Sequence, residues 1–245
     1  MSSHTAPSDH GNARHNVKRF GYLLVVSVPM LPWLGVMAWQ QWGHADAWAW
    51  FSFIGMFIIV PILDFFLGKD PNNPDEAHIK TLADDRFYRR LTYFAVPVLA
   101  LSIVGGAWGF VFFTELGLFG KIGWVMSHGL VGGTLGINVA HELIHKNTRL
   151  EKRLGDALLA MVCYPGFRIE HIYGHHRHVS TPEDRSSARF GQSLFHFLPR
   201  AIAGNVAAAF RLEALRLTRQ QVRVLSFRNE VILGYLAVAA IALAT

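Results

Sequence analysis

Two groups of histidines stand out among the 13 histidines of the sequence. The first group is HELIH, at 141–145, and the second is EHIYGHH, at 170–176. In each group two histidines are four residues apart, which places both imidazoles on one face of a helix, one turn apart. Imidazole nitrogens bind zinc, copper, iron and nickel, so this spacing predicts a shared metal site. The predicted ligands are His141, His145, His171, His175 and His176.

The other histidines do not repeat this arrangement. His178 follows the second group closely, but its offset from His175 is not the four-residue spacing. Isolated histidines near the ends of apolar segments are expected to be structural, and those in the polar N-terminal head are expected to have no chemical role. The former are His44, His128 and His196, and the latter are His4, His10 and His15.

The first group also matches the HExxH pattern, in which two histidines bind one zinc ion and Glu142 is the general base. An intramembrane metalloprotease is therefore an alternative function. Such a site needs only one further ligand, and it would leave the three histidines of the second group without a role. The surplus of histidines favours a nitrogen-rich site for two metal ions. A membrane protein without enzymatic activity is a further alternative, and it predicts no stable metal.

The histidine groups are set among long apolar segments. Apolar residues make up 51% of the chain and charged residues only 16%, whereas an ordinary soluble domain has about 25% charged residues. Four nearly uncharged segments have about the 20 residues that a membrane-spanning helix needs. The predicted spans are 20–42, 47–68, 91–113 and 122–140, and a fifth apolar segment begins at 231 and is expected to be incomplete.

These segments predict an all-α, polytopic transmembrane helix bundle over 20–245, preceded by a polar, disordered head at 1–19. Lys and Arg are concentrated before the first span, between the second and third, and after the fourth. The positive-inside rule then places the N-terminus and the metal site in the cytoplasm, at a bacterial inner membrane. The net charge of +6 is thus loop charge beside membrane lipid, and no nucleic-acid partner is expected. The mixture of apolar and basic residues at 197–219 predicts an amphipathic helix on the membrane surface.

The sequence around the histidines resembles one known family, the membrane alkane hydroxylases. These are integral-membrane, non-haem di-iron monooxygenases, related more distantly to fatty acid desaturases and xylene monooxygenase. NVAHELIHK, at 138–146, and EHIYGHHRHVSTPEDRSSA, at 170–188, resemble the first two histidine boxes of the family. KDPNNPD, at 69–75, and FRNE, at 227–230, are also similar to it. Arg185 is a departure, because the family commonly has proline there.

This resemblance implies that the five predicted ligands hold two non-haem irons. With O₂ as co-substrate, the enzyme would hydroxylate the terminal methyl group of medium- or long-chain n-alkanes, or a related terminal methyl group, to give a 1-alcohol. Electrons would come from rubredoxin and its NADH-dependent reductase. Apart from the ligands no catalytic residue is implied, and Glu142, Glu170 and Asp184 would orient the imidazoles through their free N–H groups. A fatty acid desaturase or acyl hydroxylase remains an alternative, because the same di-iron oxidant can do either reaction.

The family has a further histidine box near its C-terminus and another histidine before it. The resemblance therefore implies that these 245 residues correspond to the N-terminal portion of a hydroxylase, without the last histidine ligands. On this interpretation five imidazoles are part of the ligand set, and we do not expect catalysis by this chain alone.

Overall fold

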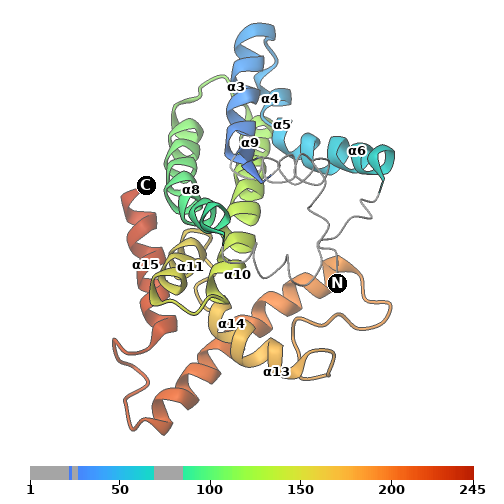
Figure 1. The fold of residues 1–245 in the computed structure, drawn as a ribbon. Coiled ribbons are helices and arrows are strands. Elements are labelled where there is room, and N and C mark those ends of the chain that lie inside the picture. The colour runs from blue at the N-terminus through green and yellow to red at the C-terminus, as the bar shows by residue number, and fades with distance from the viewer. Residues whose placement is uncertain (1–21, 24–26, 69–84) are drawn as a thin grey trace, which may run out of the picture. The chain divides into compact units, whose positions relative to one another are not determined.

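The computed structural model describes residues 22–23, 27–68 and 85–245, and all secondary structure in these ranges is helical (Figure 1). The all-α prediction is therefore confirmed for this part of the chain. The head predicted at 1–19 and the family-like stretch at 69–75 lie outside the described residues, as does much of the first half of the span predicted at 20–42. Contacts divide the chain into two compact units, Met1–Leu135 and Gly136–Thr245.

In the first unit the helices coincide largely with the apolar segments. The helical run from Phe51 to Leu67 is unbroken, although its middle is π-helical. The longest helix begins at Arg86, where the Asp85 side chain caps it by accepting a hydrogen bond from the amide of Phe87 at 2.8 Å. The elements are η1 (Val28–Met30), α3 (Leu31–Trp42), α4 (Ala45–Trp48), α5 (Phe51–Ile54), η2 (Gly55–Ile59), α6 (Val60–Leu67), α8 (Arg86–Phe112) and α9 (Leu118–Val131).

An aromatic core holds this unit together. The Trp124 indole is fully buried, and its Nε1 donates a hydrogen bond to the Gly106 carbonyl at 2.8 Å, which joins α9 to α8. Trp39 of α3 meets Phe113 edge to face, with ring centroids 5.2 Å apart, and Phe113 meets Trp124 in the same way at 5.3 Å. Edge-to-face geometry is the favourable arrangement of aromatic rings, so these contacts fix three helices against one another.

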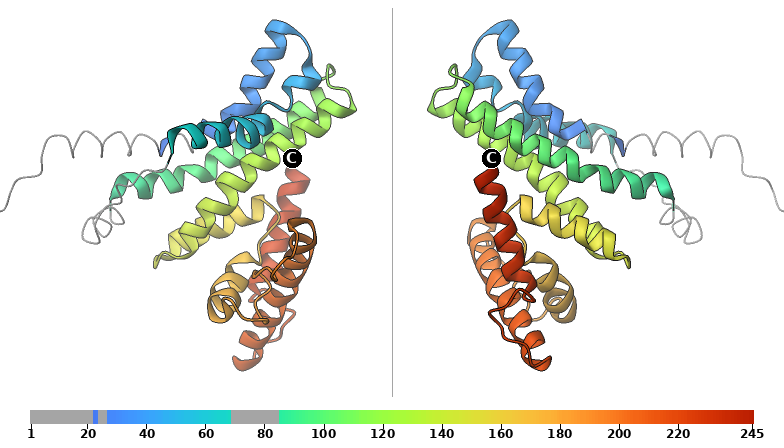
Figure 2. Two further views of the ribbon diagram at one scale, coloured as in Figure 1. Left: turned by 90° about the vertical axis from the view of Figure 1, so that its right-hand side faces the viewer. Right: turned by 90° about the vertical axis from the view of Figure 1, so that its left-hand side faces the viewer.

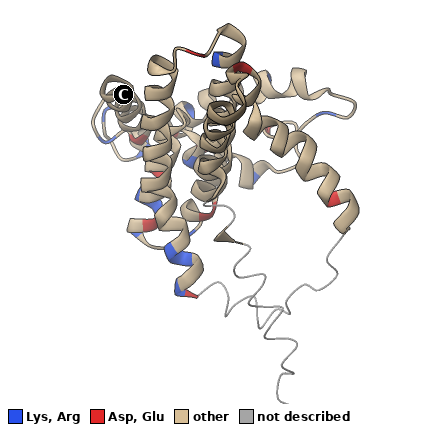
Figure 3. Cartoon of the chain, turned by 90° about the horizontal axis from the view of Figure 1, so that it is seen from above, with Lys and Arg blue, Asp and Glu red and all other residues tan. Residues whose placement is uncertain are grey.

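By length and composition, α8 is the one helix within the described ranges that could cross a membrane. The run Phe51–Leu67 and helix α15 (Glu230–Ala244) are apolar but shorter. Charged residues are sparse along most of the helices (Figure 3). The span predicted at 91–113 coincides with most of α8, and the four-span arrangement stays a prediction.

All residues of the second unit are described, and its secondary structure is helical, with non-helical connections between the helices (Figures 1 and 2). A helix covers the segment 197–219, and it begins slightly earlier, at Leu194, where the Ser193 hydroxyl accepts the amide hydrogen bond of His196. Its predicted position on the membrane surface stays a prediction. The elements are the end of η3 (Gly132–Asn138), α10 (Val139–Ile144), α11 (Arg149–Met161), α12 (Phe167–Glu170), η4 (His171–His175), α13 (His176–His178), α14 (Leu194–Arg219) and α15.

A network of charged side chains joins four helices of this unit. Arg168 of α12 donates to Asp156 of α11 at 2.6 Å and also pairs with Glu230 at the start of α15. Glu213 of α14, which is 1% exposed, accepts two hydrogen bonds from Arg216 at 2.6 and 2.7 Å. The Glu213 carboxylate also accepts the amide hydrogen bond of Glu230 at 2.7 Å. This bond joins α14 to the first residue of α15.

Helices α10 and α11 pack closely at Gly155. A Cβ atom at this position would lie 2.9 Å from Cγ2 of Ile144 and 3.3 Å from the Ala140 carbonyl oxygen. We expect Gly155→Val to push α11 away from α10 and to lower the free energy of unfolding by about 1–3 kcal/mol. Chemical unfolding in detergent measures this change. Gly129→Val is the control, because nothing lies within 4 Å of a Cβ there, and equal losses for both variants would contradict the prediction.

Candidate metal centre

The two histidine groups occupy helical segments of different geometry. His141 and His145 lie one turn apart at the end of α10, with ring centroids 4.8 Å apart, as their spacing predicts. The second group passes from α12 through the π-helical turn η4 into α13. A π turn bonds residues five apart, so it brings His176 rather than His175 over His171. The ring centroids of His171 and His176 are 4.5 Å apart, against 5.3 Å for His171 and His175.

His171 is the centre of the cluster. Its Nε2 lies 3.0 Å from Nε2 of His176 and 3.2 Å from Nε2 of His145. One ligand atom each of His141, His145 and His171 can be chosen so that all lie within 4.8 Å of one another. The His171 side chain is buried, and the ring of Phe167 stacks on it with centroids 4.8 Å apart. The other four imidazoles are more exposed, so the cluster is open on one side.

Burial and mutual repulsion favour the neutral form of two of these imidazoles, His171 and His145. Burial is the main cause that lowers the pKa of His171 to about 4, and the neighbouring imidazoles, His141 first, lower it further. The pKa of His145 is lowered by burial and then by His141 and His176. A neutral imidazole has a free lone pair, which is the form that a metal ion binds.

The donor set fits a transition-metal ion. Two nitrogens that each lie about 2.1 Å from one ion, at the angles of octahedral or tetrahedral coordination, are about 3.0–3.4 Å apart. The distances of 3.0 and 3.2 Å around His171 Nε2 match this separation. Neutral imidazoles suit iron, zinc, copper and nickel alike, and Cys163 is a free, exposed thiol outside the cluster.

Asp184 is the carboxylate that contacts a predicted ligand. It is 3% exposed, and its two oxygens lie 3.0 and 3.1 Å from Nδ1 of His175. Its oxygens also accept hydrogen bonds from the Ser187 hydroxyl at 2.6 Å and the Ser186 amide at 2.9 Å. Burial acts to raise the pKa of Asp184, but the bonds from Ser187, His175 and Ser186 outweigh it and hold the pKa low. An ionised Asp184 keeps the proton of His175 on Nδ1 and leaves Nε2 as the basic nitrogen.

The other two carboxylates are placed differently. The Glu142 side chain is 55% exposed and pairs with Lys146 at 2.6 Å, and no hydrogen bond joins it to an imidazole in the described part of the chain. Glu170 is 3% exposed, and its Oε2 has no hydrogen-bond partner among the described residues. Burial is the main cause that raises the pKa of Glu170. Among the described residues, neither Glu142 nor Glu170 therefore makes a hydrogen bond to an imidazole like the one between Asp184 and His175, and their predicted role in orienting imidazoles stays a prediction.

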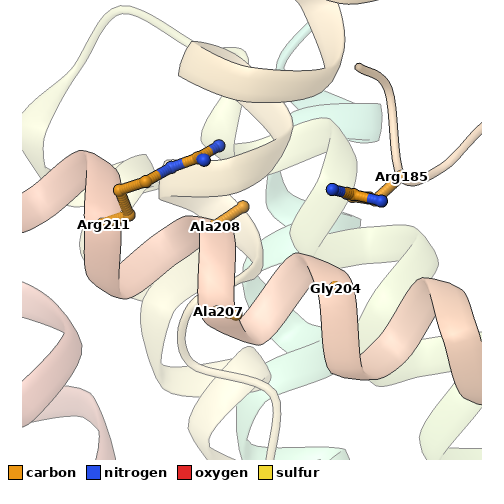
Figure 4. A pocket seen from close by; sticks show the side chains of 5 residues that line it. All are labelled: Arg185, Gly204, Ala207, Ala208 and Arg211. Atoms are coloured by element: carbon orange, nitrogen blue, oxygen red, sulfur yellow. The ribbon is translucent and has the colours of Figure 1, made fainter. Parts of the chain in front are cut away.

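A cavity of about 190 Å³ lies beside α14 (Figure 4). Its lining consists of Arg185, Gly204, Ala207, Ala208 and Arg211. None of the five clustered histidines lines it, so this cavity is not where a substrate would meet a metal in the cluster. Sequence reasoning did not single out Ser186 and Ser187, although both lie in the stretch that resembles the second histidine box.

In the described residues, an all-helical fold brings together imidazoles from two helical histidine groups, an arrangement typical of the histidine-box class of proteins. Comparison with known families gives the same result, since residues 122–245, just over half of the chain, match the fatty acid desaturase family. The chain belongs to this family.

Individual relatives are alkane 1-monooxygenases. Alkane 1-monooxygenase 1 of Pseudomonas aeruginosa is 47% identical over 225 residues, and alkane 1-monooxygenase 2 of the same organism is 42% identical over 224 residues. Alkane 1-monooxygenase 2 of Alcanivorax borkumensis is 42% identical over 223 residues. These matches cover 89–90% of this chain and 58% of each relative, so the chain spans somewhat over half the length of the proteins it matches. The resemblance to alkane hydroxylases is confirmed.

Proposed function

We propose that this chain forms part of an O₂-dependent alkane 1-monooxygenase, which hydroxylates the terminal methyl group of a medium- or long-chain n-alkane. One observation carries the proposal. The imidazoles of His145, His171 and His176 meet at 3.0–3.2 Å, in a chain that is 42–47% identical to alkane 1-monooxygenases.

The five histidines would hold two non-haem irons, which supply the activation of O₂ for insertion into a C–H bond. The residues of the chain prepare this site in three ways. His171 is buried at the centre and is neutral because its pKa is low. Asp184 holds the His175 proton on Nδ1, so that Nε2 is available. Phe167 covers one face of the His171 ring and excludes water from it.

The site would lie at the cytoplasmic face of the inner membrane, in a multi-pass protein with the four predicted spans. Helix α8 and the apolar run Phe51–Leu67 support this proposal, as does the concentration of Lys and Arg after the fourth span. An n-alkane dissolves in the hydrocarbon layer, so a site at the membrane meets its substrate there. Rubredoxin and its NADH-dependent reductase are the proposed electron donors, and basic residues such as Arg149 and Lys152 would attract an acidic carrier.

Fatty acid desaturation is a second candidate, because the matching family is that of the fatty acid desaturases. The zinc metalloprotease has less support. All three histidines of the second group contact the imidazoles of the HELIH group or one another, which a single zinc site does not require. Glu142, the base of such a protease, is paired with Lys146 instead.

A chimeric enzyme tests the proposal. In alkane 1-monooxygenase 1 of P. aeruginosa, the region that matches this chain is replaced by the chain itself, and membranes are supplied with NADH, rubredoxin and its reductase. We expect bound iron and conversion of n-alkane to 1-alcohol, and neither in the same chimera with His171→Ala. Desaturated fatty acids without alcohol would instead support the desaturase. A chimera that is folded and contains iron, but forms neither product, would overturn both oxidative functions.

A further inference from the structure

The turn that contains Asp184 is held from the side by helix α14. Asp184 receives two hydrogen bonds from its own turn, one from Ser186 and one from Ser187. Two side chains of α14, which lie about one helical turn apart on that helix, donate hydrogen bonds to those two serines. A set of hydrogen bonds therefore runs from α14 through the turn to Nδ1 of His175.

Asn205 makes the first of these connections. It is 7% exposed, and its Nδ2 donates to the Ser186 hydroxyl at 3.0 Å and to the Tyr164 hydroxyl oxygen at 3.3 Å. A buried amide is costly unless its polar atoms are satisfied. Oδ1 of Asn205 nevertheless has no partner among the described residues, so burial of this amide is not fully compensated by hydrogen bonds. The packing of α14 alone would therefore favour an apolar residue at this position.

Arg200 makes the second connection. Its Nη2 donates to the Ser187 carbonyl oxygen at 2.8 Å and to Oε1 of Gln192 at 3.3 Å. The guanidinium also lies over the Phe197 ring, 5.5 Å from its centroid, which limits its motion. Arg200 therefore fixes the backbone of Ser187, whose hydroxyl donates to Asp184 at 2.6 Å.

Close packing accompanies these bonds. A Cβ atom on Gly204 would lie 3.0–3.2 Å from the Cβ, Cγ and Cδ atoms of Arg185. Figure 4 shows the Arg185 side chain beside α14, near Gly204. The absence of a side chain at Gly204 thus lets the turn approach the helix, between the two positions that bind it.

We propose that Arg200 and Asn205 are positioning residues for His175, and that they act through Ser187, Ser186 and Asp184. This inference rests on the proposed role of His175 as an iron ligand. A ligand imidazole needs its second nitrogen fixed by a partner, and loss of such a partner lowers metal affinity by about 10–100-fold. Arg200 and Asn205 lie one hydrogen-bonded partner further from the metal, and we expect the loss of either to lower metal affinity by about tenfold at most.

The test is binding of Co²⁺, as a spectroscopic probe for Fe²⁺, to the 245-residue chain in detergent. Arg200→Leu and Asn205→Leu are expected to lower Co²⁺ affinity by about five- to tenfold and to shift the visible absorption of the bound ion. Arg200→Lys keeps a cationic donor and should recover most of the affinity. Arg211→Leu is the matched control, because Arg211 lies on the same helix, is exposed, and has no polar partner among the described residues.

A double-mutant cycle separates positioning from a general loss of structure. If the two residues act through Asp184, their replacement has no further effect on Co²⁺ affinity in an Asp184→Asn background. Unchanged affinity in the single variants would overturn the inference while leaving the proposed function intact. An equal loss in the Asp184→Asn background, or in Arg211→Leu, would also overturn it. If the unmodified chain binds Co²⁺ no better than His171→Ala does, the proposed metal site itself fails.

Discussion

His171→Ala is expected to abolish metal binding by the histidine cluster. The His171 imidazole contacts the rings of all four other predicted ligands, with centroid distances from 4.5 to 5.3 Å. Its Nε2 is also the atom shared by both short nitrogen–nitrogen contacts. Loss of this ring therefore removes a ligand and separates the two histidine groups. Affinity for Fe²⁺ or Co²⁺ should fall by more than the roughly 100-fold that follows loss of an outer partner.

Metal content by elemental analysis and Co²⁺ titration measure this loss. His178→Ala is the matched control, because His178 is exposed and its two hydrogen bonds, both donated by Thr181, are accepted by its backbone carbonyl. That variant should bind metal as the unmodified chain does. Full metal binding by His171→Ala would show that the cluster is not centred on this residue, and an equal loss in His178→Ala would place the ligand set differently.

Arg168→Leu is expected to destabilise the second unit by about 3 kcal/mol. Arg168 is 15% exposed and is the cation between Asp156 and Glu230. Burial raises the pKa of Asp156, while the charge of Arg168 and its hydrogen bond oppose that rise. Without the guanidinium, Asp156 would lose its ion-pair partner, and Glu230 would be left with Arg216 at 3.6 Å, which also pairs with Glu213. Breaking a buried ion pair by removal of one partner costs about 3–5 kcal/mol, and the half-exposed acids place this case at the lower end.

Unfolding in detergent with increasing denaturant measures the effect, and Arg211→Leu is again the control on an exposed arginine. If the loss of stability comes from unpaired charges, a second result is expected. Replacing Arg168, Asp156 and Glu230 together with apolar residues should recover most of the stability, since no unpaired charge then remains buried. If the triple replacement is less stable than Arg168→Leu alone, the network contributes through its geometry and not through the pairing of its charges.

Local spacing was sufficient to predict the main parts of the site. The four-residue interval between His141 and His145 predicted a shared face, and α10 has it. The apolar and basic mixture at 197–219 predicted a helix, which is α14. The resemblance of the second histidine box predicted a role for Asp184 near an imidazole, and it contacts His175. Each of these signals depends on residues that are near one another in the sequence.

The parts that were not predicted depend on contacts between distant segments or on unusual backbone bonding. The spacing of His171 and His175 assumed an α-helix, whereas the segment forms a π turn that pairs His171 with His176. Glu142 was expected to orient an imidazole, but Lys146, four residues away, is its partner. Arg168 and Glu230 are 62 positions apart, so no local pattern could pair them.

The π turn at 171–175 also accommodates one residue more than an α-helical turn would. Each residue of an α-helix rotates the chain by about 100°, so the same residues in ordinary helical bonding would turn every later residue by roughly that angle. His175 would then take the place of His176 over His171. Deletion of Gly174 together with ordinary helical bonding would instead keep the later residues nearly in phase, because the residue lost is the one that the π turn accommodates. The bonding pattern of this segment, and not its length alone, therefore decides which imidazole lies over His171.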